Sequence, residues 1–533
     1  MKRTDISGPD NQRSFNKVLV RSAIVVSLVI LGLTLFPFDF TRLGFTPRLA
    51  AFVGQRFLPA ESLWDDIIVN VVLFVPLGMI FGGLALRRYT GGKSFVLVTM
   101  GGALFSCVIE ALQLFLPFRF SSIFDIASNT AGSLIGFVLM FLGQARIRGM
   151  ADRFVRSRAT TRLATAFIAL LAFFTMLSFP LLHASRFTGW DRTSSFTIGN
   201  DASGRRPWFG KISEVAISRM GTSHDEVRKT FSRDELFVAD KSNLVCKYEI
   251  RNSSPVNSSV SGMPQLVTRR AVAGGRKELV KWLKSKSAAE HLTSSVVSTG
   301  RFSLYFTYAS DVVSSHAPSS LIAIAKNSEQ LNLALTQMGA DLIISLRTMA
   351  TGLEGNKPQF VVPDFFQDTK KHRALITCEK WVLRVYRDSP ENVQTFVIGP
   401  GLALTNRFLP SYRTLDITSR FADINEVLFA LIVTVPLGLI SSRMVYVMRR
   451  RRLISAAIAS AAIVLPALMM GLAIAFMTGR PFDTEHFLRM AILMALSKSL
   501  FFLMMVREER FSLASHNGPV SPAVTSTVHE QSY

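Results

Sequence analysis

The chain has 533 residues, with 60 Lys and Arg against 37 Asp and Glu for a net charge of +23, and 49% of its residues are hydrophobic, which gives a mean hydropathy of +0.31. This combination excludes a single large soluble enzyme and a disordered protein, and three cysteines are too few for a disulfide-rich scaffold. The apolar residues must be gathered into blocks, which leaves room for a bundle of membrane helices and one folded domain of ordinary size.

Eight segments are apolar enough over about 20 residues to cross a membrane as helices. They are Val18–Pro37, Asp66–Leu86, Phe95–Leu116, Phe124–Gly143, Leu163–Leu182, Ile424–Tyr446, Leu453–Phe476 and His486–Val506. Basic residues precede the first segment, as in a signal peptide, but the segment is long and no small-residue cleavage site follows it. We therefore expect residues 1–17 to be a cytoplasmic N-terminus that leads into an uncleaved signal anchor.

Clusters of basic residues set the expected orientation, because cytoplasmic loops of membrane proteins hold an excess of Lys and Arg. The clusters are Arg87-Arg88 with Lys93, the run from Arg146 to Arg162, and Arg449–Arg452. The clusters follow the second, fourth and sixth segments, each of which returns to the side of the N-terminus, so all of them fall on one side of the membrane. The sequence thus predicts a multi-pass protein of an inner (cytoplasmic) membrane, with both termini cytoplasmic and residues 183–423 extracytoplasmic. Residues 507–533 are expected to be a disordered cytoplasmic tail.

Most of the net charge is explained by this topology, so no nucleic-acid partner is predicted. The outer segment nevertheless has 32 Lys and Arg against 21 Asp and Glu between His183 and Ala422. Topology does not require that excess. A positive outer face favours an anionic partner such as an acidic glycan, a phosphate-bearing polymer or lipid headgroups. A solvated basic surface without a partner is the alternative.

Polar residues interrupt the second to fourth apolar segments, although an ionisable group there costs roughly 2.5–3.5 kcal/mol. Glu110 and Gln113 share one helix face, as do Asp125 and Asn129. At a rise of about 1.5 Å per residue, these positions reach a similar depth near the outer surface. The expected polar layer comprises Asp66, Asn70, Glu110, Gln113, Arg119, Asp125 and Asn129.

Two interpretations of the polar layer are open. Ser128, Gly132 and Gly136 form a strip of small residues that is typical of closely packed membrane helices, which favours a set of hydrogen bonds that locks the helices together. The layer can also be a site that receives a polar headgroup from the outer leaflet. In either case a pairing of Arg119 with Asp125 or Glu110 would stabilise the buried charges.

The same residues carry a resemblance to the VanZ-like membrane family. The motif is Ser106…Glu110-x-x-Gln113…Pro117-x-Arg119-x-Ser121…Asp125-x-x-x-Asn129-x-x-Gly132…Gly136, preceded by Asp66…Asn70-Val-Val-Leu-Phe-Val-Pro-Leu-Gly78. The resemblance covers about residues 20–145, and a weaker echo at Asn425-Glu-Val-Leu-Phe429 extends it to about 424–506. It implies a role in the bacterial cell envelope. The family's namesake is linked to glycopeptide-antibiotic resistance, and no settled reaction goes with the family.

Between Arg186 and Arg420 the long apolar segments give way to short alternating runs with turn signals. The clearest runs are Arg301–Tyr308, Leu321–Ala325, Leu342–Arg347, Ala374–Cys378 and Trp381–Tyr386. Such spacing predicts a β-sandwich. A short helix is expected over Glu278–Glu290, and a loop over Ser253–Gly262.

Two stretches of this segment resemble the concanavalin-A-like, or laminin-G-like, jelly-roll fold. One runs from Trp190 through Ile198-Gly-Asn200 and Trp208-Phe-Gly210 to Ile217, and the other from Phe302 to Gly352. Members of this fold usually bind glycans or proteins. Some hydrolyse glycans with paired carboxylates on a Glu-x-Asp-x-x-Glu strand, which this sequence lacks, so the resemblance implies binding.

Three tryptophans, Trp190, Trp208 and Trp381, are candidates for stacking on sugar rings, although each also fits the core of a sandwich. Cys246 and Cys378 both fall in the outer segment, where a disulfide between them can form. The histidines are scattered and no metal-binding or phosphate-binding motif is present, so neither a metal nor a cofactor is predicted.

The sequence as a whole predicts a multi-domain protein made of an α-helical transmembrane bundle of about eight spans and an all-β, concanavalin-A-like sandwich. Residues 18–182 are expected to form a five-span VanZ-like bundle, 183–423 the sandwich, and 424–506 three further helices. We expect it to contact membrane lipids and to bind an anionic envelope glycan or a lipid-linked glycan precursor. No catalytic motif supports an enzyme. The alternatives are an intramembrane enzyme with Glu110 or Asp125 as general base, and an assembly scaffold whose sandwich binds a protein.

Overall fold

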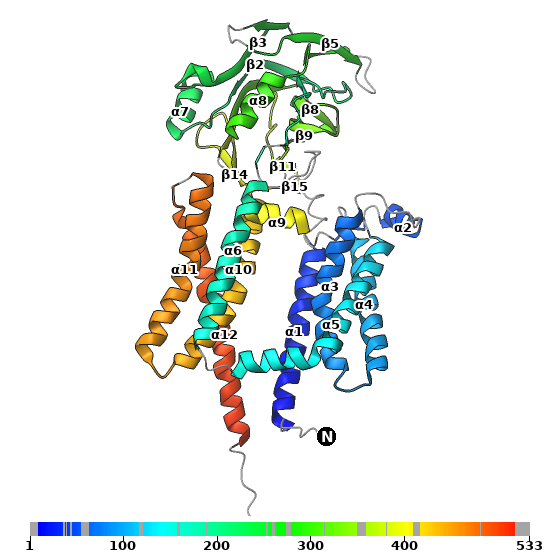
Figure 1. Ribbon diagram of the computed structural model, residues 1–533. Helices are drawn as coiled ribbons and strands as arrows, with labels where there is room; N and C mark the ends of the chain where they lie inside the picture. The colour runs from blue at the N-terminus through cyan, green and yellow to red at the C-terminus, as the bar shows by residue number, and fades with distance from the viewer. Residues whose placement is uncertain are drawn as a thin grey trace, which may run out of the picture. The chain divides into compact units, whose positions relative to one another are not determined.

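The computed structural model of the chain describes residues 9–35, 38, 40–42, 45–54, 63–116, 121–156, 160–184, 186–187, 189–251, 254–257, 262–272, 279–313, 315–348, 359–379, 381–408, 416–479 and 481–516. The chain divides into two compact units. The first comprises residues 1–157 and 181–426, and the second comprises residues 158–180 and 427–533. Helices and a pair of β-sheets make up the first unit, and the second is helical (Figure 1).

The N-terminal helices of the first unit are α1 (Pro9–Leu35), α2 (Phe45–Val53), α3 (Leu63–Ala85), α4 (Gly91–Gln113) and α5 (Ile123–Arg156). Of these, α3, α4 and the part of α5 up to Gly143 are long and apolar enough to cross a membrane. The described apolar stretch of α1, Ser22–Gly32, is shorter than a full span. The second to fourth expected spans are therefore confirmed as apolar helices.

Close contact between α3 and α5 follows from glycines that face the neighbouring backbone. A Cβ atom on Gly78 of α3 would collide with the backbone of Ser133, and one on Gly136 of α5 would collide with the backbone of Val75. Without these Cβ atoms the two helices approach until their backbones touch, as small residues allow in membranes. Phe74 and Ile109 are fully buried in the apolar core beside this contact.

The second unit contains most of α6 (Thr160–Ala184) and α10 (Ser419–Met448), together with α11 (Arg452–Thr478) and α12 (Thr484–His516). All four are long and apolar enough to span a membrane. Within the unit, Thr175 Oγ1 of α6 lies 3.8 Å from the Met470 sulfur of α11. Ser442 Oγ of α10 donates a hydrogen bond of 2.6 Å to the Lys498 carbonyl of α12.

This grouping corrects two expected boundaries. The fifth span, α6, belongs to the unit of the last three helices, so residues 18–182 do not form one five-span bundle. The C-terminal tail also starts later than expected, because α12 continues as a helix to His516. Residues 517–533 lie outside the described part of the chain.

Fifteen strands form an eight-stranded and a seven-stranded sheet in the described residues of the first unit. Sheet A has the order β15-β11-β10-β9-β8-β1-β6-β5, and sheet B has the order β14-β13-β12-β7-β2-β3-β4. The strands are β1 (Ser195–Ile198), β2 (Gly210–Ser218), β3 (Leu244–Arg251), β4 (Ser254–Asn257), β5 (Leu266–Val272), β6 (Leu279–Ser285), β7 (Phe302–Ser310), β8 (Ser315–Ala325), β9 (Leu331–Gly339), β10 (Asp341–Leu346), β11 (Gln359–Val362), β12 (His372–Glu379), β13 (Val382–Arg387), β14 (Val393–Val397) and β15 (Asp416–Ile417). Pairing is antiparallel except between β11 and β15. Three short helices, α7 (His224–Arg233), α8 (Glu290–Thr299) and α9 (Pro400–Phe408), complete this part.

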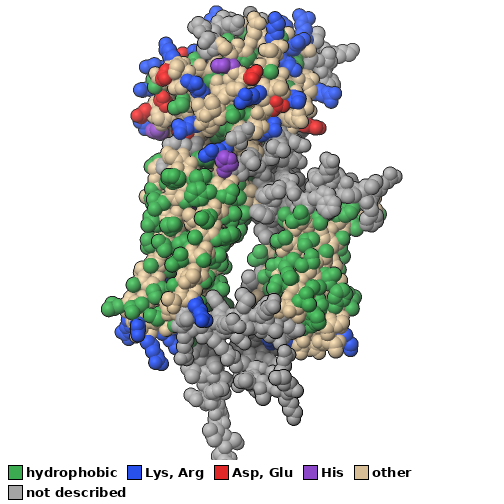
Figure 2. Space-filling model, in the orientation of Figure 1, with side chains coloured by type: hydrophobic (Ala, Val, Ile, Leu, Met, Phe, Trp, Pro, Cys, Tyr) green, Lys and Arg blue, Asp and Glu red, His purple; other side chains and the backbone are tan. Residues whose placement is uncertain are grey.

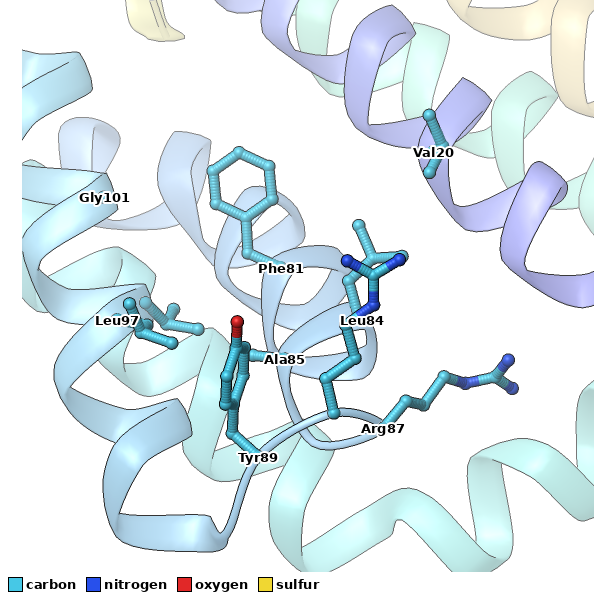
Figure 3. Close-up of a pocket in the computed structure, with 10 residues that line it drawn as sticks. Val20, Phe81, Leu84, Ala85, Arg87, Tyr89, Leu97 and Gly101 are labelled. Atoms are coloured by element: carbon cyan, nitrogen blue, oxygen red, sulfur yellow. The ribbon is translucent and has the colours of Figure 1, made fainter.

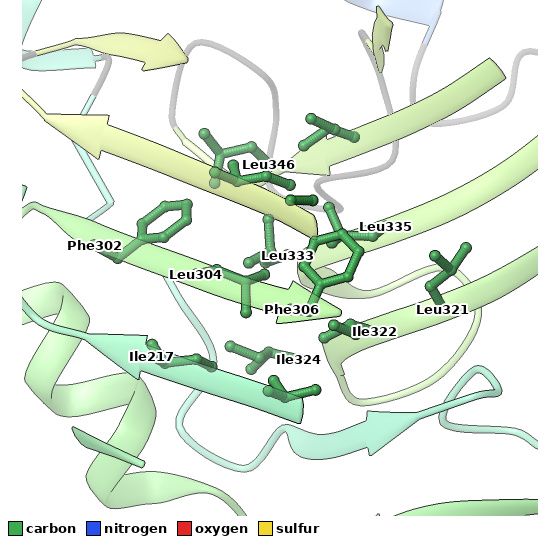
Figure 4. Close-up of a cluster of buried hydrophobic side chains, with 14 of the residues drawn as sticks. Ile217, Phe302, Leu304, Phe306, Leu321, Ile322, Ile324, Leu333, Leu335 and Leu346 are labelled. Carbon is green, nitrogen blue, oxygen red and sulfur yellow. The ribbon is translucent and has the colours of Figure 1, made fainter. Parts of the chain in front are cut away.

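The two sheets enclose one hydrophobic core, to which every second residue of the central strands contributes (Figure 4). Phe302, Leu304 and Phe306 project from β7 of sheet B, and Ile322 and Ile324 project from β8 of sheet A. All five of the runs that the sequence marked as strands are strands here. The expected β-sandwich is confirmed, and charged side chains of both signs cover its surface, whereas the described surface of the membrane helices is largely hydrophobic (Figure 2).

Two local predictions in the sandwich were wrong. The segment expected as a helix, Glu278–Glu290, is mostly strand β6, which pairs with β1 on one side and β5 on the other. Ladder hydrogen bonds on both edges outweigh the weak local preference of this Lys-rich run. Strand β4 likewise occupies Ser254–Asn257 in the expected loop, where it extends sheet B beside β3.

The expected disulfide does not form. Cys246 on β3 and Cys378 on β12 are both free and buried in the core. Strands β2 and β7 separate them in sheet B. Three inter-strand steps of about 4.8 Å place the two cysteines well beyond the 7 Å between Cα atoms that a disulfide tolerates.

Candidate functional site

The expected polar layer is a hydrogen-bonded cluster near one end of α3, α4 and α5. Asn70 Nδ2 of α3 donates a bond of 2.8 Å to Asp125 Oδ1 in the first turn of α5. Both side chains are half-buried. The pair therefore satisfies one carboxylate oxygen while its polar atoms stay near the surface of the bundle.

Glu110 of α4 holds the start of α5. Its Oε2 accepts a bond of 2.9 Å from the Ser122 amide, and its carbonyl accepts one of 2.8 Å from Ser121 Oγ. Ser122 Oγ in turn accepts from the Phe124 amide at 3.2 Å. The first amides of a helix have no intrahelical partner and carry partial positive charge, so a carboxylate there is stabilised. These donors satisfy polar atoms of a side chain that is only 3% exposed in an apolar bundle.

A second membrane helix repeats this arrangement. Glu426 near the start of α10 is buried, and its Oε1 accepts a bond of 3.0 Å from the Gly401 amide in the first turn of α9. Asn425 beside it is fully buried. Glu426 is thus a second carboxyl group on one helix that binds the N-terminus of another.

The remaining members of the layer join helices. Asn129 Nδ2 of α5 donates to Ser106 Oγ of α4 at 2.9 Å, and Gln113 Nε2 donates to the Thr34 carbonyl of α1 at 3.0 Å. Asn129 Oδ1 is buried without a hydrogen-bond partner among the described atoms, as is Ser133 Oγ one turn further along α5.

The structure thus brings Asn70, Glu110, Gln113, Asp125 and Asn129 into hydrogen-bonded contacts among helices. Arg119 and its expected pairing lie outside the described residues, and so does the side chain of Asp66 on α3. The side chains of Asn70, Glu110, Gln113 and Asn129 each bind a residue of another segment, which is what a helix lock requires. The Asn70–Asp125 pair is half-buried, and so is more exposed than Glu110 and Asn129.

The sandwich has its own pocket, of about 280 Å³, where β1, β2, β3 and β6 meet. Two lysines, Lys211 of β2 and Lys281 of β6, line it together with Trp208 and Trp282. Both lysines are exposed and have no ion-pair partner among the described residues, in contrast to Lys247, which lies 2.9 Å from Glu235. A pocket with two cations and no acidic lining residue favours an anionic ligand.

The tryptophans named from the sequence do not form a sugar-stacking surface. Trp190 is 6% exposed and donates its Nε1–H to the Arg347 carbonyl at 2.7 Å. Trp208 is 2% exposed and donates to Gln337 Oε1 at 2.6 Å. Trp381 is half-buried and packs against the core. Burial removes the ring faces of Trp190 and Trp208 that stacking needs, so these two residues belong to the core of the sandwich.

Sequence reasoning missed Lys211, Lys281 and Trp282. The last two lie in the segment that was expected to be a helix. Trp282 is 7% exposed, and its Nε1–H has no partner among the described atoms. The available signal was the Lys-Trp-Leu-Lys run itself, but only the packing of β6 in sheet A against β2 in sheet B brings this run beside Lys211.

A second charged cluster surrounds His372. Its ring nitrogens lie 2.7 Å from Asp388 Oδ2 and 2.8 Å from Asp368 Oδ1, and Arg373 binds the carbonyl of Asp388 at 3.1 Å. The hydrogen bond from His372 lowers the pKa of Asp368. These groups satisfy one another, and no cluster with metal-ligand character occurs among the described residues.

Comparison with known proteins gives one result. Residues 18–144 match a family model described as VanZ/LLP1. That range contains α3, α4, the apolar part of α5 and all described members of the polar layer. No curated protein and no solved structure gives a significant match to the chain.

Proposed function

Residues 18–144 form a VanZ-like domain of a multi-pass membrane protein, and we propose that this protein binds an anionic glycan of the cell envelope, or its lipid-linked precursor, at its β-sandwich. The pocket between Lys211 and Lys281 is the observation that carries the proposal. The excess of basic residues in the outer segment supports it, because a positive surface concentrates an anionic polymer before it binds.

Charge rather than ring stacking provides the affinity. The rings of Trp208 and Trp282 are almost fully buried and form the walls of the pocket, so they limit its shape. Its volume lies just below the range of about 300–1,000 Å³ for small-molecule sites. The pocket therefore suits one acidic sugar at the end or branch of a chain, whose carboxylate or phosphate pairs with the lysines.

The polar layer fits a supporting role. Glu110 is committed to the start of α5, which argues against the alternative of an intramembrane enzyme with Glu110 as a free general base. The half-buried pair of Asn70 and Asp125 is accessible enough to meet the headgroup of a lipid-linked precursor. Asn70→Ala, which removes the amide donor of the pair, should then weaken binding of the lipid-linked form and leave binding of the free glycan unchanged.

Calorimetry of the full-length protein in nanodiscs tests the proposal. The probes are oligogalacturonate, which has one carboxylate per sugar, and neutral dextran oligosaccharides. We expect salt-sensitive binding of oligogalacturonate alone. Lys211→Gln combined with Lys281→Gln should weaken it about 3- to 10-fold, since exposed charge pairs contribute modestly.

Lys241→Gln is the matched control, because Lys241 is exposed near the opposite end of β2. It should leave the affinity unchanged. An equal loss of affinity with Lys241→Gln would show that general surface charge, and not the pocket, attracts the ligand. Equal binding of dextran and oligogalacturonate, or binding of neither, would contradict the proposal.

A further inference from the structure

A larger pocket, of about 600 Å³, lies at the loop between α3 and α4 of the VanZ-like domain (Figure 3). Arg87, Arg88 and Tyr89 of the loop line one end. Apolar side chains line the rest, including Leu84 of α3 and Leu97 of α4, and Val20 of α1 faces them across the space. The pocket is thus polar at one end and apolar along its length.

The chain places the two arginines at the border of the membrane. The apolar span of α3 ends at Ala85, and α4 begins at Gly91 after a turn of a few residues. The amides of Arg88 and Tyr89 both donate to the Ala85 carbonyl, at 3.0 and 2.9 Å. This tight turn fixes the guanidinium-bearing residues directly above the end of the span.

The apolar part of the pocket extends into the hydrocarbon region. Phe81 is six residues before Arg87, and Gly101 is ten residues after the start of α4, which at about 1.5 Å per residue corresponds to roughly 9 and 15 Å. Nothing lies within 4 Å of a Cβ added to Gly101, so the pocket is open there. Val20 and Leu97 are each 47% exposed, which leaves the space accessible from the lipid side.

We propose that this pocket binds an anionic glycerophospholipid. Its phosphate would lie between Arg87 and Arg88, and an acyl chain would follow Leu84 and Leu97. Guanidinium groups bind phosphate through paired, charge-assisted hydrogen bonds, and the Tyr89 hydroxyl adds a donor. No Asp or Glu is among the described lining residues. The mouth of the pocket, formed by Arg87, Arg88 and Tyr89, therefore complements an anionic headgroup better than a zwitterionic one.

The shape selects a lipid over a free anion. A free phosphate would use only the mouth and leave the apolar part empty. Basic pockets between membrane helices on the cytoplasmic side are typical binding sites for anionic headgroups. The nearby Lys93 adds to the basic signature of a cytoplasmic loop. This site is therefore independent of the glycan pocket proposed above, which lies in the outer segment.

Native mass spectrometry of the full-length protein tests the proposal. The detergent-purified chain is titrated with phosphatidylglycerol and with phosphatidylcholine of the same acyl chains. We expect the first to bind more tightly. Arg87→Gln combined with Arg88→Gln should weaken phosphatidylglycerol binding about 10- to 30-fold, given the contribution of each basic residue at a lipid surface. Binding of phosphatidylcholine should not change.

Two further variants separate the pocket from general charge. Lys93→Gln removes an exposed charge of the same region that does not line the pocket, and it should have no effect. Gly101→Phe keeps both arginines but fills the apolar part, and it should weaken phosphatidylglycerol binding as strongly as loss of the arginines. Thermal unfolding of each variant confirms that it is folded.

Three results would overturn the inference. Lys93→Gln could be as damaging as the arginine pair, which would mean that only surface potential attracts the lipid. Inorganic phosphate could displace phosphatidylglycerol at millimolar concentration while Gly101→Phe has no effect, which would make the mouth a phosphate site. The arginine pair could also be replaced without any change in lipid binding.

Discussion

At the scale of single residues, two glutamates bind the same lysine from different environments. Lys247 Nζ on β3 lies 3.4 Å from Glu214 Oε1 on β2 and 2.9 Å from Glu235 Oε2 in the loop after α7. Burial raises the pKa of Glu214 above its ordinary value. The hydrogen bond from Lys247 lowers the pKa of the more exposed Glu235. The lysine thus outweighs desolvation at the exposed Glu235, whereas desolvation outweighs the lysine at the half-buried Glu214.

The opposite shifts predict opposite effects of neutral substitutions. A carboxyl with a raised pKa loses stability as the pH rises through that value, so Glu214→Gln should raise the unfolding temperature of the sandwich at pH 7. A carboxyl with a lowered pKa contributes stability above its unfolded pKa of about 4.3 and loses it below. Glu235→Gln should therefore lower the unfolding temperature at pH 7, and this effect should disappear as the pH falls through the lowered pKa of Glu235. Each change should stay within about 4 °C.

Tryptophan fluorescence of the full-length protein measures these changes, because four of the five tryptophans, Trp190, Trp208, Trp282 and Trp381, lie in the sandwich. Each variant serves as the control for the other, since both keep one partner for Lys247. A shift in the same direction for both variants at pH 7 would show that the loss of the ion pair, and not burial, decides the effect.

At the scale of elements, the sequence predicts helices and strands that a local pattern determines, but not those that depend on pairing with distant strands. Long apolar runs identified the helices of both units because each span must satisfy its own backbone hydrogen bonds. The alternating runs of β7 and β12 were equally readable. Strand β6 was not, because its Lys-rich pattern becomes a strand only between β1 and β5. The glycan pocket was missed for the same reason, since it combines Lys211 and Lys281 from strands of different sheets.

In the polar layer, too, the sequence predicted where the side chains lie but not which groups they bind. Helix spacing predicted that Glu110 and Asn129 would lie at a similar depth in one polar layer, and both side chains are buried and hydrogen-bonded between helices. It could not predict that Glu110 would bind the Ser122 amide, because that contact depends on how closely α4 approaches the start of α5. Only the packed structure distinguishes a carboxylate that holds a helix from one that is free for a ligand.

Helix packing gives a sharp prediction for two glycines. A Cβ on Gly136 would lie closer than 3.0 Å to the backbone of α3, which no side-chain rotation relieves, whereas Gly101 on α4 has nothing within 4 Å. Gly136→Ala should therefore destabilise the full-length protein by about 1–3 kcal/mol. Gly101→Ala should be neutral or stabilising by up to about 1 kcal/mol, because alanine is the better helix former.

Thermal unfolding followed by gel filtration in detergent compares the two variants. Because the substitution is the same, any general effect of an added methyl group in the membrane cancels. If both variants unfold at the same temperature, the close approach of α3 and α5 is not the contact that holds the VanZ-like domain together.

At the scale of the whole molecule, both proposed sites depend on which side of the membrane each loop faces. Apolar helices occur in both units, and the segment with the sandwich lies between them in the sequence. The basic clusters at Arg87-Arg88 and at Arg449–Arg452 belong to different units. The positive-inside rule assigns both clusters to the cytoplasm. A glycan site in the sandwich and a lipid site at Arg87 are then on opposite sides.

Single cysteines test this orientation. Cys107 is first replaced by Ala, and Cys246 and Cys378 remain because both are buried, with burial raising the pKa of Cys246 to about 12. New cysteines then replace Gly92, Lys286 or Arg451, which are all exposed. A membrane-impermeant maleimide should label Lys286→Cys in intact spheroplasts, and Gly92→Cys and Arg451→Cys only in inside-out vesicles.

Each outcome bears on a different proposal. Labelling of Gly92→Cys from outside would place Arg87 and Arg88 in the outer leaflet, where the cytoplasmic lipid site cannot exist. Labelling of Lys286→Cys only from inside would separate the sandwich from every extracellular glycan. If Gly92 and Arg451 face opposite sides, an odd number of spans lies between them, and one of α4, α5, α6 and α10 does not cross the membrane as the charge pattern predicts.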